Sequence, residues 1–112
     1  MLKKFTNKKI EVSFTPHLSP MFRGILSTIY LDLNKNVNQS KVITLLSKFY
    51  KKEKFVKISK SNTLISTNDV INTNYCNIAL CRTRDKSKMI VLSAIYNVMK
   101  GGAGQAIQNM NM

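Results

Sequence analysis

Residues 77–95 read NIALCRTRDKSKMIVLSAI. Two apolar runs, 77–82 and 88–95, lie on either side of the charged segment 83–87. Short apolar runs bounded by a polar turn are typical of β-strands. This stretch therefore predicts two successive strands, and we expect the rest of the chain to extend the sheet that they begin.

Alternation of apolar and polar residues predicts strands upstream as well. Every second residue is apolar in segment 9–15 (KIEVSFT), and apolar residues recur in phase in segment 25–33 (ILSTIYLDL). Segment 55–58 (FVKI) predicts a further short strand. Pro16 and Pro20 separate the first two segments. Because a proline fixes its own φ and pushes the preceding residue toward extended geometry, we expect a stiff, non-helical connector there.

A helix is predicted over residues 41–52 (KVITLLSKFYKK). Its apolar residues recur at helical spacing, and they are Val42, Leu45, Leu46 and Phe49. Ser40 is the expected N-cap, because its hydroxyl can accept a hydrogen bond from an unpaired N–H of the first turn. Lysines near the helix end suit the macrodipole, and they are Lys48, Lys51 and Lys52. The polar segment 59–74 predicts a loop, and the helix is expected to cover one face of the sheet.

Length and composition limit the protein to a small domain. The chain has 112 residues and is 44% hydrophobic, and a domain of this size buries roughly 65% of its unfolded surface. The sequence contains no run of about 18 apolar residues, and its start, MLKKFTNKK, lacks the apolar stretch of a signal peptide. We therefore expect a cytoplasmic protein that does not bind a membrane.

The formal net charge of +13 would suit a nucleic-acid-binding protein. However, fifteen of the eighteen basic residues are lysines, scattered from Lys3 to Lys100. A nucleic-acid footprint concentrates charge on one face and uses arginine forks. The pattern favours a solvated lysine surface with no specific nucleic-acid partner, and a basic nucleic-acid-binding module remains the alternative.

The two cysteines do not form a recognisable metal or redox motif. Cys76 and Cys81 are five residues apart, and the only histidine, His17, is far away in the sequence. This spacing matches neither a C-x-x-C pair nor a zinc knuckle. We expect buried structural thiols and no bound metal, since free cysteine usually behaves as a small apolar residue.

Glycines precede the last apolar segment of the chain. Residues 100–104 (KGGAG) run into 105–110 (QAIQNM), which predicts the start of a helix. N–H groups at such a start attract phosphate or carbonyl oxygens. The spacing is neither that of a dinucleotide-binding fold nor that of a P-loop. A tight turn that lets the helix pack on the strand at 88–95 is the alternative explanation.

Three motifs resemble one enzyme family. FTPHLSPMFRGILSTIY (14–30), TNYCNI (73–78) and SAIYNVMKGGAGQAIQNMN (93–111) occur in this order and are similar to the C-terminal part of N-acetyl-gamma-glutamyl-phosphate reductases. The resemblance implies an α+β fold like the C-terminal domain of glyceraldehyde-3-phosphate dehydrogenase, with a mixed, mostly antiparallel sheet and helices on one face. It also implies that residues 1–112 are an incomplete substrate-binding and dimerisation domain without the Rossmann domain.

The family's activity follows from the resemblance. It implies an NADP-dependent reductase of arginine biosynthesis, which converts N-acetyl-glutamyl phosphate to N-acetylglutamate semialdehyde and forms homo-oligomers through the sheet. NADP would be bound mainly by the absent N-terminal domain. Related aminoadipate-type reductases of lysine biosynthesis are equally compatible with these residues.

The family's two catalytic motifs are absent from this sequence. Its nucleophilic cysteine lies in a Gly-Cys-Tyr-Pro segment and its acid–base histidine in a His-Arg-His segment, and neither occurs here. We therefore expect no catalytic residue in the chain and no activity from the chain alone. His17 occupies the family's post-strand motif and is expected to line the substrate pocket, with structural hydrogen bonding as the alternative.

The remaining candidate site residues are expected to bind substrate or cofactor. Arg23 lies between the proline connector and Gly24 and could grip a carboxylate or acyl phosphate with its planar fork; capping a strand end or pairing across an interface is the alternative. Asn97, Lys100 and Gly101 match the family's Asp-Asn-Leu-Val-Lys-Gly segment, which implies contact with the nicotinamide end of NADP. Tyr96 stands where the family usually has aspartate, so Asn97 lacks that polar support.

Overall fold

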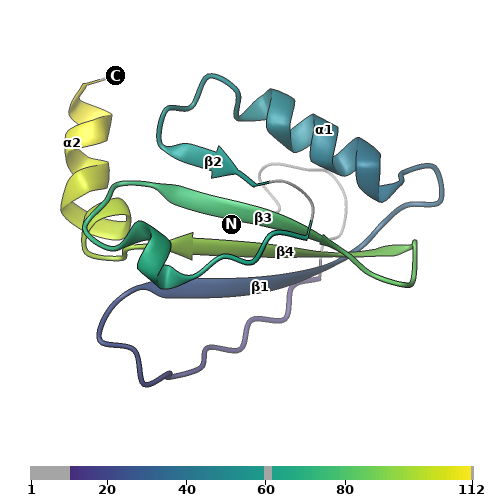
Figure 1. Cartoon of the computed structure of the whole chain (residues 1–112), viewed down its shortest axis with the longest axis horizontal. Helices are drawn as coiled ribbons and strands as arrows, with labels where there is room; N and C mark the ends of the chain where they lie inside the picture. Colours follow the sequence, from purple (N-terminus) through teal and green to yellow (C-terminus); the bar gives the residue numbers. More distant parts are fainter. Residues whose placement is uncertain (1–10, 60–61, 112) are drawn as a thin grey trace.

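Four strands form a mixed sheet in the order β1-β4-β3-β2 in the computed structural model of the chain (Figure 1). The structure describes residues 11–59 and 62–111. In chain order, the elements are β1 (Ile25–Asp32), α1 (Gln39–Phe49), β2 (Val56–Ile58), the 3-10 turn η2 (Thr67–Val70), β3 (Cys76–Arg82), β4 (Lys88–Ile95), the π-helical turn η3 (Met99–Ala103) and α2 (Gly104–Met110). The strands predicted at 25–33, 55–58, 77–82 and 88–95 are all confirmed.

Strand β4 lies inside the sheet and is antiparallel to both of its neighbours, β1 and β3, whereas β2 is parallel to β3. The sheet is therefore mixed and mostly antiparallel, as the resemblance implied. In the turn between β3 and β4, the Asp85 carboxylate accepts hydrogen bonds from the Ser87 hydroxyl at 2.6 Å and the Ser87 N–H at 2.9 Å. These two bonds lower the pKa of Asp85, and they explain why a charged turn closes this pair of strands.

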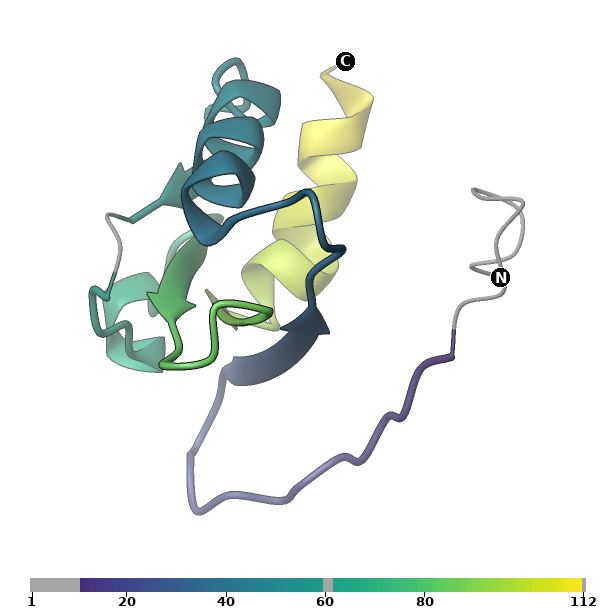
Figure 2. The same ribbon diagram turned by 90° about the vertical axis from the view of Figure 1, so that its right-hand side faces the viewer.

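Both α-helices lie on one face of the sheet and η2 lies on the other, as seen nearly along the strands in Figure 2. Hydrogen bonds connect the start of α1 to the end of β3 and the start of β4. The Arg82 guanidinium donates to Ser40 Oγ at 3.2 Å, and the buried Gln39 side chain donates to Lys88 O at 2.7 Å. The predicted α+β layering, with helices on one face, is confirmed.

The core is small and lies on both faces of β3 and β4. Leu80 and Met89 are buried on the face that carries the helices, as strand alternation requires. Ala79 and Ala94 are buried on the opposite face, where η2 packs on β3 and β4 and buries Val70 completely. Because alanine side chains are short, they let η2 approach the sheet closely.

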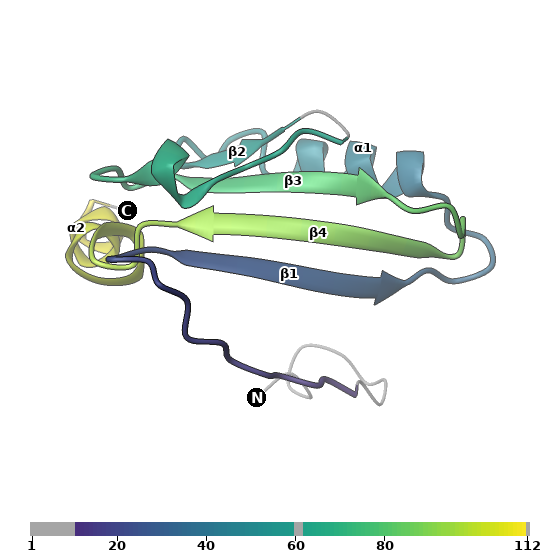
Figure 3. The same cartoon turned by 60° about the horizontal axis from the view of Figure 1, so that its bottom comes forward.

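The predicted strand at 9–15 is wrong for the residues that the structure describes. Lys9 and Ile10 lie outside the described residues, and 11–15 form no strand. Val12 is 63% exposed and Phe14 is 84% exposed, and the segment runs apart from β1 (Figure 3). Alternation predicts a strand only where a neighbouring strand can pair with it, and among the described residues this segment has none.

The helix begins and ends earlier than predicted. Its N-cap is Asn38, whose Oδ1 accepts a hydrogen bond from Lys41 N at 2.8 Å, and its last residue is Phe49. Ser40 lies inside the first turn, so the prediction of a Ser40 cap is wrong. Asn38 has the extended backbone that a cap requires, with φ of −103° and ψ of 163°. Lys51 and Lys52 follow the helix rather than ending it.

Replacing Asn38 with alanine should therefore lower the free energy of unfolding by about 1 kcal/mol, because one N–H of the first turn loses its acceptor. The matched control is Ser40→Ala, which removes only an exposed contact with Arg82 and should cost less than about 0.5 kcal/mol. Urea denaturation followed by circular dichroism measures both. A larger loss for Ser40→Ala would contradict the assignment of Asn38 as the cap.

Candidate functional site

The candidate site lies where β4 ends and β1 begins. Ile95, the last residue of β4, pairs with Ile25, the first residue of β1. The residues just outside this pair are joined as well, because Gly24 N donates to Asn97 Oδ1 at 3.0 Å across 73 positions of sequence. Two of the three motifs, 14–30 and 93–111, therefore meet at this end of the sheet.

Gly24 makes this junction possible. Its φ is +110°, in a region that side chains rarely permit, and a Cβ there would lie 3.1 Å from both Thr67 Cβ and Thr67 Cγ2. Only glycine combines that backbone conformation with the close approach of η2. The Gly24 N–H is consequently held where it can donate a hydrogen bond to Asn97 Oδ1.

The contact with Gly24 also orients the Asn97 side chain. Asn97 is exposed, and its carbonyl oxygen is engaged by the Gly24 N–H. An asparagine amide has one oxygen acceptor and one NH₂ that donates two hydrogen bonds. With one of the two lone pairs of this oxygen engaged and the side chain thereby oriented, Asn97 can offer its NH₂ donors to a ligand at this site.

Arg23 directly precedes Gly24, whose N–H donates to Asn97. Its guanidinium lies 5.2 Å from the centroid of the Phe22 ring, and both side chains are exposed.

His17 lies farther back on the connector. It is exposed, and its Nδ1 is 3.2 Å from Thr15 O. The structure thus places the backbone of Arg23 next to the bond between Gly24 and Asn97, with its guanidinium beside Phe22, whereas the ring of His17 contacts its own connector.

The turn after β4 carries the other two cofactor candidates. Met99 N and Lys100 N both donate to Tyr96 O, at 3.0 and 2.9 Å, and this turn leads through η3 into α2. Gly101 is exposed, and a methyl group there would lie 3.7 Å from Asn97 Cβ, an ordinary contact distance. The backbone at Gly101 is therefore open beside Asn97.

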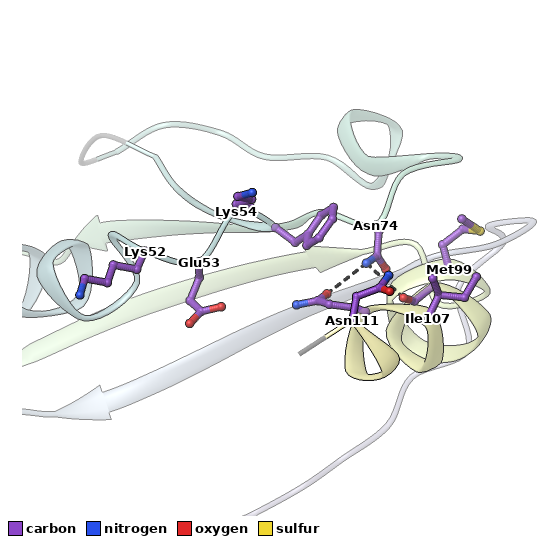
Figure 4. Close-up of a pocket in the computed structure, with 10 residues that line it drawn as sticks. Lys52, Glu53, Lys54, Asn74, Met99, Ile107 and Asn111 are labelled. Atoms are coloured by element: carbon purple, nitrogen blue, oxygen red, sulfur yellow. Dashed lines mark hydrogen bonds between the residues drawn. The ribbon is translucent and has the colours of Figure 1, made fainter.

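Lys100 points to a different place. Its Nζ donates to Gln108 Oε1 at 2.8 Å and lies 5.7 Å from the centroid of the Phe55 ring. Gln108 and Phe55 line an open hollow of about 550 Å³ between α2 and the segment that precedes β2 (Figure 4). The lining residues are Lys52, Glu53, Lys54, Phe55, Asn74, Met99, Gly104, Ile107, Gln108 and Asn111.

Asn74 was assigned no role from the sequence, although it belongs to the quoted motif 73–78. Its Nδ2 donates to Gly104 O at 3.3 Å and to Gln108 Oε1 at 3.1 Å. Gly104 is buried against it, since a Cβ at Gly104 would come within 2.5 Å of Asn74 Oδ1. Gly104 therefore serves packing, but against Asn74 before β3 and not against the strand at 88–95 that the sequence suggested.

Within the described part of the chain, the thiols and the metal-binding residue types do not gather into a second site. Cys76 and Cys81 are free and half-buried in β3, rather than fully buried as expected, and Cys76 Sγ lies 3.6 Å from Ser93 Oγ. Among residues 11–59 and 62–111, no group of three or more His, Cys, Asp or Glu side chains could hold a metal ion. In the same residues, no helix is long and apolar enough to cross a membrane.

Comparisons with known proteins agree on one family. Residues 1–97 match the semialdehyde dehydrogenase, dimerisation domain family. The chain is 44% identical over 111 residues to the N-acetyl-gamma-glutamyl-phosphate reductase of Thermoanaerobacter pseudethanolicus, an alignment that covers 99% of this chain and 32% of the relative. It is 45% identical over 111 residues to the reductase of the same name from Desulfotalea psychrophila, with the same coverage of both chains. It is also 43% identical over 113 residues to that of Halothermothrix orenii, covering 100% of this chain and 33% of the relative. The chain thus spans about a third of the length of these relatives.

Proposed function

The chain belongs to the semialdehyde dehydrogenase dimerisation-domain family, and on that premise we propose that it forms part of the C-terminal domain of an N-acetyl-gamma-glutamyl-phosphate reductase. The whole enzyme would reduce N-acetyl-glutamyl phosphate to N-acetylglutamate semialdehyde in the cytoplasm, as a step of arginine biosynthesis. The names of the relatives support this reaction. In this proposal residues 1–112 supply substrate and subunit contacts, and a Rossmann domain outside them holds most of the cofactor.

The observation that carries the proposal is the hydrogen bond from Gly24 N to Asn97 Oδ1. This bond joins the motif proposed to bind substrate to the motif proposed to bind cofactor. A reductase needs these two motifs side by side, because the hydride passes from the cofactor to the acyl group of the substrate. Arg23, next to Gly24, would bind the phosphate or carboxylate of the substrate with its guanidinium. For His17 to contact the same substrate, the exposed connector would have to bring its ring from Thr15 O toward Arg23.

The residues at the junction fit the nicotinamide end of NADP in part. The Asn97 NH₂ would donate to the carboxamide oxygen, and the open backbone at Gly101 would let the ring approach. NADPH supplies the hydride when it is bound. Lys100 does not fit a direct role, because its ammonium is already bonded to Gln108.

The chain alone is expected to be inactive. A thioester route needs a thiolate nucleophile and an imidazole acid–base group, and the motifs that hold them in the family do not occur in these residues. The role left to Arg23 and Asn97 is to bind and orient, which raises the effective concentration of the reacting groups.

Homo-oligomer formation is consistent with the family's dimerisation domain, and we propose that it uses the sheet. The edge strand β1 exposes large apolar side chains on both faces, since Leu26 and Ile29 are 45% and 44% exposed and Tyr30 is 77% exposed. Apolar groups gathered along a strand in this way are typical of subunit interfaces. A second copy would remove them from water.

A chimaera tests the proposed function. The chain would replace the corresponding third of the Thermoanaerobacter pseudethanolicus reductase. The reverse reaction would be measured, in which the semialdehyde reduces NADP and phosphate is taken up into the acyl phosphate. We expect turnover from the chimaera and none above background from the chain alone. Asn97→Asp should lower kcat/KM about 10- to 100-fold, because a carboxylate still accepts from Gly24 but cannot donate to the cofactor.

Asn109→Ala is the matched control for this experiment. Asn109 is exposed on α2, where its Oδ1 accepts from Gln105 Nε2 at 2.8 Å, and its loss should leave turnover unchanged. An Asn97→Asp chimaera as active as the unaltered one would rule out the donor role of Asn97. A chimaera that folds but binds RNA rather than turning over substrate would favour the nucleic-acid alternative.

A further inference from the structure

The resemblance implies that Lys100 binds the cofactor, but its side chain is engaged within the chain. We propose that Lys100 is instead a positioning residue, which holds Asn97 in place through a clasp with Gln108 and Asn74. The proposal rests on the function proposed above, because Asn97 is the residue that the clasp serves.

Two donors of the clasp meet at one oxygen atom, Gln108 Oε1. Lys100 Nζ donates to it at 2.8 Å and Asn74 Nδ2 donates to it at 3.1 Å. An amide oxygen has two lone pairs, so these donors use its full capacity. The three side chains are half-buried, where a hydrogen bond to a charged group is stronger than on an exposed surface. The ring of Phe55 adds a cation–π contact on the lysine side.

Asn74 fixes the clasp to the sheet. It lies directly before Tyr75 and the start of β3, and its Nδ2 also donates to Gly104 O at 3.3 Å. Gly104 is the first residue of α2 and is buried against the Asn74 amide. The start and middle of α2 are therefore tied to the same asparagine.

The clasp reaches Asn97 through one turn of backbone. Met99 N and Lys100 N both bond to Tyr96 O, so Asn97 lies within the turn that Lys100 closes. On the other side, Asn97 Oδ1 accepts from Gly24 N. The turn is thus tied to the residues before β3 through Lys100, Gln108 and Asn74, and to the residues before β1 through Asn97 and Gly24. Opening the first attachment should loosen the second.

A direct cofactor-binding role for Lys100 would require the clasp to open. The ammonium would have to leave both Gln108 Oε1 and the Phe55 ring, and the Gln108 oxygen would keep a single donor. Asn97 would then lose the support of α2 at the moment when it is needed. The positioning role requires no such movement.

Hydrogen exchange of the Gly24 amide in the unliganded chain, measured by NMR, tests the clasp. Lys100→Met keeps an unbranched side chain but removes the ammonium, and it should speed Gly24 exchange about tenfold by weakening the bond to Asn97. The backbone amides that pair β3 with β4 should exchange at the same rate as in the unaltered chain. Lys100→Arg can still donate to Gln108 and stack on Phe55, so it should keep Gly24 exchange within about threefold of the unaltered chain.

Asn97→Ala is the control that removes the acceptor directly, and it should set the upper limit of the Gly24 exchange rate. Gly24 exchange unaltered by Lys100→Met, or accelerated equally in the β3–β4 amides, would overturn the clasp. If Lys100→Met does not fold, Gln108→Glu replaces it. A carboxylate holds the ammonium more strongly, so Gly24 exchange should slow, and unchanged or faster exchange would overturn the proposal. No cofactor is present in this measurement, so failure of the chimaera would affect only the proposed function.

Discussion

Replacing Gly104 with alanine is expected to lower the free energy of unfolding by about 2–4 kcal/mol, through overpacking and the loss of Asn74 hydrogen bonds. The added Cβ would lie 2.5 Å from Asn74 Oδ1, 2.9 Å from Met99 O and 3.0 Å from Asn74 Cγ. The Asn74 side chain could move aside only by breaking its bonds to Gly104 O and Gln108. Met99 O belongs to the backbone and cannot move without distorting η3. Urea denaturation measures the loss.

Gly101→Ala is the matched control for Gly104→Ala. Its Cβ would meet Asn97 Cβ at 3.7 Å and Ile95 Cδ1 at 3.8 Å, which are ordinary contacts, and Gly101 is exposed. Alanine removes conformational freedom from the unfolded chain, so this variant should be neutral or more stable by up to about 1 kcal/mol. Equal losses for the two variants would show that glycine is needed for backbone conformation rather than for space.

The strands were predictable because their patterns are local. The runs at 77–82 and 88–95 are mostly apolar, with polar residues chiefly at their ends, and either run can pair with any neighbouring strand. The segment at 9–15 has an equally regular pattern, yet 11–15 form no strand, since pairing depends on a partner and not on the pattern itself.

Asn38 rather than Ser40 caps α1 for a similar reason. Both residue types can cap a helix, and the path of the chain after β1 decides which of them has extended geometry.

The site was predictable only as far as the resemblance reached. It proposed Arg23 and Asn97 as site residues, and the structure joins the two segments that carry them, because Ile25 pairs with Ile95 and Gly24 bonds to Asn97. That register joins residues about 70 positions apart, and no local pattern contains it. The direction of Lys100 and the contacts of Asn74 depend on how α2 docks, which is also a long-range feature. The glycines could be noticed in the sequence, but only the fold separates Gly104, which needs space, from Gly24, which needs a positive φ.

Replacing Leu80 with alanine should have the largest effect on the sheet itself, with a loss of about 2–5 kcal/mol of unfolding free energy. Leu80 is 0% exposed in β3, and its truncation removes apolar contacts and leaves a cavity beneath the helix-bearing face. Among the described residues, the buried apolar side chains are Val70, Ala79, Leu80, Met89 and Ala94, and two of these are alanines. The remaining core is therefore too small to compensate, and a domain of this size has only about 5–15 kcal/mol of stability in total.

Leu64→Ala makes the same chemical change at a position that is 89% exposed, and it should alter stability by less than about 0.5 kcal/mol. Both variants remove the same side-chain volume, so most of the difference between their losses reports the burial of Leu80. Measured by thermal denaturation, the Tm of Leu80→Ala should be lower than that of the unaltered chain by roughly 10 °C or more. The Tm of Leu64→Ala should be unchanged. If both variants fell equally, the interior of the sheet would not be the source of stability, and the junction of Gly24 and Asn97 would lack the rigid frame that its geometry requires.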